Sequence, residues 1–316
     1  MDAQVIPVAT MKLQEISYNG YRWINITDPD QEMVQYLGEN FKYHPLDLED
    51  VLSKVSYPKI DAYQNYLFII LQFPVYETAR RIYKRSELNI FFGHDYLITI
   101  NGGQLTALQN FFETCRIDEV ARQKFMRGGV GMLLWEILDS HMDYVFPIIN
   151  QKNDLIFQLE EEIFENPELK DMIQEIMILK RNIINLRRIL SPQRQVFVDL
   201  GGKHQKFVPE ELRIYFDDLV DKQDKIVSQL DTAKSYVDVL EDANESLITR
   251  STNRLLKLLA VFSVIPFPLQ LLLNYYGMNI PLPWQNDPHI LGYINGALFI
   301  MAVLMIAFIY KKRWLS

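Results

Sequence analysis

The sequence predicts an α+β membrane protein with an N-terminal α/β cytosolic domain, a long helical stalk and two C-terminal transmembrane helices. Short β-rich runs dominate the N-terminal third, a stretch without glycine or proline follows Pro209, and the C-terminal stretch is almost entirely apolar. The expected segments are 1–127 for the α/β domain, 128–208 for a helical region, 209–254 for the stalk, 255–276 and 290–310 for the transmembrane helices, 277–289 for an external loop and 311–316 for a basic cytosolic tail.

Strands in the α/β domain are predicted by three runs that are rich in β-branched and aromatic residues. The runs are YRWINI from Tyr21, YLFIILQFPVY from Tyr66 and ELNIFFGHDYLITI from Glu87. Helical spacing occurs at Asp28–Leu52 and again after Gly103. A cluster of glycines at 128, 129 and 131 is expected to end the domain.

Helices are predicted to fill the next region and the stalk. Met132–Glu165 and Leu169–Leu190 are periodic, with a possible kink at Pro147, and Gly201 and Gly202 are expected to form a loop. One unbroken helix is expected over Glu210–Ile265. Its heptad seam predicts packing on other helices, and an intrachain bundle is favoured over an oligomeric coil. The seam consists of Ile226, Leu230, Ala233, Val237, Leu240, Asn244 and Leu247.

Two C-terminal segments are apolar and long enough to cross a membrane as helices. Ile290–Tyr310 has no charged residue, and Leu255–Tyr276 has only Lys257, near one end. Pro266 and Pro268 would break a helix in a soluble protein, but the span Leu255–Tyr276 tolerates them where neighbouring helices satisfy the freed carbonyls. This span is therefore expected to pack against partner helices.

The distribution of basic residues predicts the orientation of the two spans. The connector between Gly277 and His289 contains no Lys or Arg, whereas basic residues flank the end of each span that lies away from this connector. By the positive-inside rule both chain termini are expected in the cytosol. The expected location of the protein is the cell (inner) membrane. The N-terminus has an acidic Asp2 and no apolar core, so no signal peptide is expected. The flanking residues are Arg250, Arg254, Lys257, Lys311, Lys312 and Arg313.

Composition excludes several classes of protein. A net charge of -8 argues against binding nucleic acid, which demands clustered basic residues. The single cysteine, Cys115, allows neither an internal disulfide nor a cysteine-based zinc site. The sequence has no phosphate-binding loop, no H-E-x-x-H and no nucleophile elbow, so an enzyme is not expected. A bilayer and cations are the expected partners.

The polar side chains around the first span share one face of the helix, within an arc of about 100°. Such residues are costly in lipid unless they hydrogen-bond to a partner or line water. Two explanations fit this polar face, which we call the polar stripe. Its side chains either hydrogen-bond to a neighbouring helix or line a water-filled pore, and a pore requires several copies of the chain around an axis. Carboxamide oxygens suit hard cations. The polar stripe consists of Asn253, Leu256, Ala260, Ser263, Phe267, Gln270 and Asn274.

The first span ends in Tyr276, Gly277, Met278 and Asn279, and this YGMN resembles the signature of the CorA family of magnesium transporters. The resemblance extends to further segments and covers most of the chain. It implies a homopentameric channel with a funnel-shaped cytosolic domain and a pore lined by the first span. The further segments are HPLDLED at 44–50, PKI at 58–60, LKRNIINLRRILSPQR at 179–194, TNRLLKLL at 252–259 and Pro268.

By this resemblance Gly277, Met278 and Asn279 form the outer selectivity filter and Asn253 an inner polar ring. The hydrophobic gate positions are Leu256, Leu259 and Phe267, with Ala260, Ser263, Gln270 and Asn274 also lining the pore. The loop IPLPWQNDPH lacks the family's usual glutamate, and Asp287 is expected to supply that outer charge. The implied function is Mg²⁺ uptake down the membrane potential.

Three alternatives stay open from the sequence. A Zn²⁺, Co²⁺ or Ni²⁺ transporter has the same architecture, and His289 in the loop suits a softer metal. The second alternative is an efflux or proton-coupled zinc transporter of the same architecture. The third is a membrane-anchored scaffold, which has no use for Asn279. The family is also regulated by cytosolic Mg²⁺, but no acidic residue is assigned as a sensor. The acidic candidates are Glu210, Glu211, Asp217, Asp218, Asp221 and Asp224.

Overall fold

The computed structural model describes residues 13–53, 57–165, 172–204, 206–264, 266–278 and 288–311 of the 316-residue chain. Its contacts divide the chain into two compact units. The N-terminal unit is formed by Met1–Phe164 with Lys170–Leu240, and the C-terminal unit by Glu165–Leu169 with Glu241–Ser316. Each unit is described separately below.

A six-stranded sheet, in the order β1-β2-β6-β5-β4-β3, forms the centre of the N-terminal unit. β2 and β6 run parallel, and the other neighbouring strands are antiparallel. The strands are β1 Leu13–Tyr18, β2 Tyr21–Thr27, β3 Lys59–Ala62, β4 Leu67–Glu77, β5 Ile82–Phe92 and β6 Tyr96–Asn101. The three predicted β-rich runs are confirmed as β2, β4 and the pair β5–β6.

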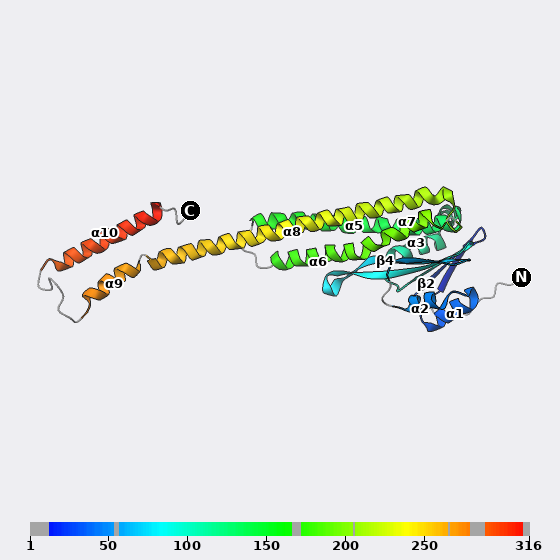
Figure 1. Cartoon of the computed structure of the whole chain (residues 1–316), viewed down its shortest axis with the longest axis horizontal. Coiled ribbons are helices and arrows are strands. Elements are labelled where there is room, and N and C mark those ends of the chain that lie inside the picture. Colours follow the sequence, from blue (N-terminus) through cyan, green and yellow to red (C-terminus); the bar gives the residue numbers. More distant parts are fainter. Residues whose placement is uncertain are drawn as a thin grey trace. The chain divides into compact units, whose positions relative to one another are not determined.

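Strand β4 is buried on both faces, which explains its continuous apolar sequence. Every residue from Leu67 to Pro74 is buried, so side chains that alternate in direction meet helices on either side of the sheet. Figure 1 shows α1 and α2 on one side of the sheet and the long helices on the other. The central strands therefore hold the two helical layers of this unit together.

Helices α1 (Gln31–Phe41) and α2 (Pro45–Leu52) pack on one face of the sheet. Asp30 caps α1, since its Oδ1 accepts a 2.9 Å hydrogen bond from the Met33 amide. The core between these helices and the sheet is aromatic and aliphatic. It includes Ile24, Ile26, Leu37, Tyr43, Val51, Tyr66, Phe68, Ile70, Phe91, Ile98 and Ile100.

On the other face, helix α6 (Met172–Leu190) contacts β4 and β5, and buried amides fix its position. Asn182 Oδ1 accepts a 3.0 Å bond from the Tyr83 amide, and Asn182 Nδ2 donates to the Arg81 carbonyl at 2.9 Å. Gln193 Oε1 likewise accepts from the Gln72 amide at 3.0 Å. The remaining elements are η1 Thr78–Arg80, α3 Thr106–Ile117, α4 Glu119–Met126, α5 Gly129–Glu165, α6 Met172–Leu190, η2 Ser191–Gln193, α7 Arg194–Gly202, η3 Glu210–Leu212, α8 Arg213–Val264, α9 Pro266–Tyr276 and α10 Ile290–Lys311.

The heptad seam of α8 packs inside the chain over the part that belongs to the N-terminal unit. Ile226, Leu230 and Val237 are fully buried in the single chain, and Ala233 and Leu240 are 3% exposed. Since no second copy is needed to cover these side chains, the intrachain bundle that the sequence favoured is the arrangement found.

An ion-pair ladder joins α8 to α6 and the start of α7. Lys180, Arg187 and Arg194 are seven residues apart, and so are their respective partners Asp238, Asp231 and Asp224. The N···O distances are 2.8, 2.5 and 2.6 Å. The number of the basic residue rises from pair to pair while that of the aspartate falls, so α8 runs antiparallel to α6.

Several predicted boundaries are wrong for local reasons. Gly201 and Gly202 lie in the last turn of α7 instead of a loop, since packing of this helix overrides their low helix propensity. The helix predicted from Met132 starts earlier, at Gly129, as α5. The predicted start of the next helix, Leu169, lies outside the described residues, and α6 is described from Met172. Gly129 has a φ of +84°, which marks the entry to α5. The helix α5 continues through Pro147.

One helical stretch in the described part of the chain, within Glu210–Tyr275, is long and apolar enough to cross a membrane. The described residues also contain a shorter apolar helical stretch, Gly292–Phe308, inside α10. The first predicted span is thus supported by length and composition. The second span stays a prediction.

Candidate functional site

The polar stripe lies on α8 and α9 and is accessible in the single chain. Leu256, Leu259 and Phe267 are 56%, 63% and 66% exposed. Asn253, Ser263, Gln270 and Asn274 are also exposed, and Ala260 is half-buried. The most apolar part of this stretch has no residue buried inside the chain. Lipid or further protein must therefore cover these side chains in a membrane.

Ser263 shows how a hydroxyl on the polar stripe is arranged. Its Oγ donates a 2.9 Å hydrogen bond to the Leu259 carbonyl, one turn earlier in α8. The hydroxyl proton is thus used within the helix. The oxygen lone pairs remain as acceptors, so at this position α8 presents an acceptor to water or a cation instead of a donor.

The polar stripe follows α8, Arg213–Val264, and α9, Pro266–Tyr276. Asn253 and Ser263 lie on α8, whereas Gln270 and Asn274 lie on α9. Ile265, between these two elements, lies outside the described residues, so the tolerance of Pro266 within one span stays a prediction.

Gly277 ends α9 with helix-like bonding. Its amide donates to the Leu273 carbonyl at 3.0 Å and to the Asn274 carbonyl at 3.2 Å, and the Met278 amide donates to the Tyr275 carbonyl at 3.5 Å. Met278 is 51% exposed. Asn279, the third filter residue, and Asp287, the predicted outer charge, lie outside the described residues. The structure thus describes two of the three predicted filter residues.

Half of the acidic residues considered as sensors have basic partners in the chain. Asp224 pairs with Arg194, which holds the pKa of that carboxyl below its usual range. Asp217 pairs with Arg213 at 3.8 Å, and Asp218 lies 3.9 Å from Lys222. Within the described ranges, no group of three or more His, Cys, Asp or Glu side chains is arranged to hold a metal ion.

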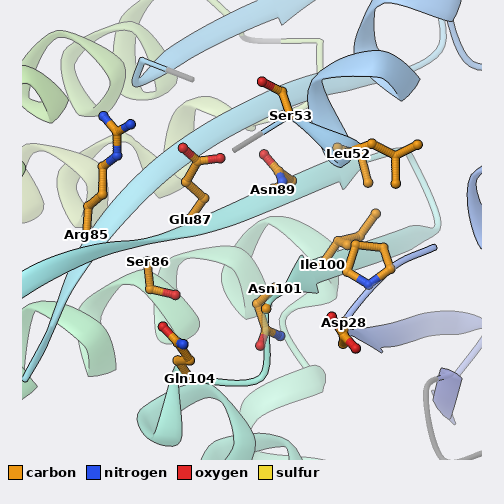
Figure 2. A pocket seen from close by; sticks show the side chains of 13 residues that line it. Asp28, Leu52, Ser53, Arg85, Ser86, Glu87, Asn89, Ile100, Asn101 and Gln104 are labelled. Carbon is orange, nitrogen blue, oxygen red and sulfur yellow. The ribbon is translucent and has the colours of Figure 1, made fainter. Parts of the chain in front are cut away.

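A polar pocket of about 370 Å³ lies in the N-terminal unit, where the parallel strands β2 and β6 end. Figure 2 shows Asn89, Glu87 and Ser53 on one side and Asn101 and Gln104 on the other. Asn89 is 4% exposed, and its buried Oδ1 has no hydrogen-bond partner within the described ranges. The charged residues that line the pocket are Asp28, Arg85 and Glu87, and those with amide or hydroxyl side chains are Ser53, Ser86, Asn89, Asn101 and Gln104.

The ion-pair ladder and the buried Lys152 were not anticipated from the sequence. A signal for the ladder was present, because lysine or arginine at 180, 187 and 194 and aspartate at 224, 231 and 238 recur with the heptad period. Lys152 gave no signal, since its burial depends on strands that are distant in sequence.

Known proteins with similar sequences are metal transport proteins. The chain is 29% identical over 303 residues to the cobalt/magnesium transport protein CorA of Thermotoga maritima, covering 93% of this chain and 83% of that protein. It is 22% identical over 188 residues to the zinc transport protein ZntB of Pectobacterium carotovorum, which covers 58% of this chain and 56% of that protein.

The fold is also that of a solved transporter. The complete structure of the CorA magnesium transporter from Methanocaldococcus jannaschii superposes with a TM-score of 0.82 at 21% identity, covering 96% of this chain and 94% of that one. Both have an N-terminal soluble α/β domain and a long helix. The family model described as "CorA-like Mg2+ transporter protein" matches residues 18–313. This chain therefore belongs to the CorA-like family of Mg²⁺ transporter proteins.

Proposed function

We propose that this chain is a subunit of a divalent cation channel that takes up Mg²⁺ into the cytosol down the membrane potential. The observation that carries the proposal is the exposed polar stripe, which is uncovered in the single chain and is followed in sequence by Gly277 and Met278. Amide and hydroxyl oxygens suit a hard cation, and neutral ligands release a divalent ion more readily than carboxylates do. The potential contributes about 4.6 kcal/mol per 100 mV to the entry of a divalent ion.

The pore in this proposal is formed by several copies of the chain, five by resemblance to the family. A single chain cannot enclose a conduit with one or two helices, so the stripes of several copies must face a common axis. Gly277, Met278 and Asn279 form the outer filter, with Asp287 adding charge outside it. Asn253 forms the inner polar ring, and Leu256, Leu259 and Phe267 narrow the path between them.

Uptake by proteoliposomes tests the filter. Mg²⁺ entry is expected to follow an imposed inside-negative potential and to fall to the level of empty vesicles in Asn279→Ala. Asn295→Ala, which removes the same amide from α10, is the matched control and should retain uptake. Equal uptake by wild type and Asn279→Ala contradicts the filter and favours the membrane-anchored scaffold.

A softer metal is the second candidate, because relatives named as zinc transport proteins match part of the chain. The external loop also has His289 and lacks the family's usual glutamate. Competition of Co²⁺, Ni²⁺ and Zn²⁺ with Mg²⁺ in the same vesicles distinguishes these cargoes. Dependence of Zn²⁺ flux on an imposed pH gradient identifies proton coupling.

The proposed topology has two spans, with both termini in the cytosol. Cys115 is buried and its pKa is raised to about 11 by burial, so it reacts poorly with maleimides. In whole cells an impermeant maleimide is expected to label Gln285→Cys and not Ser316→Cys. Labelling of both, or of Ser316→Cys alone, contradicts this topology.

A further inference from the structure

Lys152, on α5, is a buried lysine that has no acidic partner among the residues that the structure describes. The residue is 6% exposed, and burial lowers the pKa of its amine. Its Nζ lies 5.2 Å from the ring centre of Tyr83 and 5.9 Å from that of Tyr76. Among the described residues no oxygen accepts a hydrogen bond from this ammonium. The ring faces attract the charge but leave its three N–H donors without acceptors.

The side chain lines a pocket of about 210 Å³ between α5, α6 and the β4–β5 hairpin, all in the N-terminal unit. Seven water molecules occupy roughly this volume in the liquid, so a tetrahedral ion with its hydration fits. Arg81 and Glu175 lie on the wall and bind each other at 2.9 and 2.6 Å, which neutralises both. Asn182 is engaged with backbone groups of the hairpin.

The remaining charged residue of the pocket, Glu162, does not neutralise the positive charge of Lys152. Glu162 also lines the pocket, but its side chain is exposed to solvent, and no ion pair between it and Lys152 occurs in the described part of the chain. Burial of an ammonium costs free energy unless an acceptor of opposite charge is nearby. A counter-ion from solution satisfies this requirement where the protein provides none.

We propose that this pocket binds a small soluble oxyanion, of the phosphate, sulfate or short carboxylate class, on the Lys152 ammonium. Such an ion offers several oxygen acceptors to the three N–H donors, which a halide does not. It contacts α5 through Lys152 and lies beside α6 and the β4–β5 hairpin. Occupancy therefore stabilises the packing of these elements.

Titration calorimetry of the full-length chain in detergent, with inorganic phosphate, tests the proposal. The buffers contain no divalent metals. Their ionic strength is kept constant by replacing chloride with phosphate, so that general charge screening is unchanged. Wild type is expected to bind phosphate. Lys152→Met keeps the apolar stem but lacks the charge, and its affinity should fall about tenfold or more.

Two further variants sharpen the test. Glu162→Gln removes a negative charge from the pocket wall and should tighten binding about threefold. Lys124→Met is the matched control, because Lys124 also lies over an aromatic ring, that of Phe125, but outside the pocket. Its affinity should equal that of wild type.

Absence of binding by wild type up to about 10 mM phosphate would mean that water alone fills the pocket, and would overturn the proposal. Equal affinity of wild type and Lys152→Met would also overturn it, since phosphate would then bind elsewhere. Should Lys152→Met not fold, the wild-type titration and the tightening in Glu162→Gln still decide the question.

Discussion

Shortening one buried side chain of α8, in Leu230→Ala, is expected to destabilise the N-terminal unit by about 3 kcal/mol. Leu230 is fully buried in the single chain, between the equally buried Ile226 and Val237 of the heptad seam. Removal of three carbons there forfeits the transfer free energy and leaves a cavity that a packed bundle fills only in part. For a unit of this size the loss corresponds to a fall in Tm of about 6–12 °C.

The assay is thermal unfolding of the full-length protein, with hydrogen exchange of α8 peptides as a local readout. Val239→Ala is the matched control on the same helix, because Val239 is 63% exposed and its truncation should change stability by less than about 0.5 kcal/mol. The shift for Leu230→Ala should not depend on protein concentration. Equal effects of the two variants, or a shift that grows on dilution, would refute intrachain packing of this seam.

Two further predictions concern charged groups of the N-terminal unit. Asp47 is buried, accepts hydrogen bonds from Tyr63 at 3.0 Å and Tyr66 at 2.8 Å, and has a pKa raised mainly by burial. The folded state then holds this proton more tightly than the unfolded state, so stability falls as pH rises through the folded pKa. Asp47→Asn should lack this loss in unfolding curves recorded between about pH 4 and 7, and parallel pH profiles of variant and wild type would contradict the assignment. In the ion-pair ladder, Arg187→Asp should weaken attachment of α8, and adding Asp231→Arg should restore it. Double-mutant analysis of thermal unfolding at low and high salt measures this, and a double variant no better than the single one speaks against the pair.

The sequence predicted those elements whose local pattern agrees with their environment. β4 was recognisable because burial on both faces requires a continuous apolar run, and the stalk because glycine and proline are absent from it. Strand β1 was missed, although Asn19 and Gly20 both have positive φ, at 51° and 86°, and form its two-residue turn with β2. An Asn-Gly pair is a strong hairpin signal that could have identified this strand.

Prediction of the candidate site had a different limit. Helical periodicity placed the polar residues on one face of the first span, and this periodicity is a local property of the sequence. Burial of Lys152 and of Asp47 depends on contacts between segments far apart in sequence, which no periodicity encodes. What covers the polar stripe is likewise not encoded in one chain.

The repeat of the ladder has a consequence for how α8 finds its register. Acidic residues occur at 217, 224, 231, 238 and 245, so a slide of α8 by seven residues in either direction would again offer three acids to Lys180, Arg187 and Arg194. The ion pairs therefore do not distinguish alignments of α8 that differ by seven residues. The apolar heptad seam repeats with the same period, so it does not distinguish them either. Uniqueness must come from contacts that do not recur. Gln223, which donates to the Leu190 carbonyl, and Lys222, which bonds Asp139 and Asp143, are such contacts, so two side chains near one end of the stalk select one alignment from several.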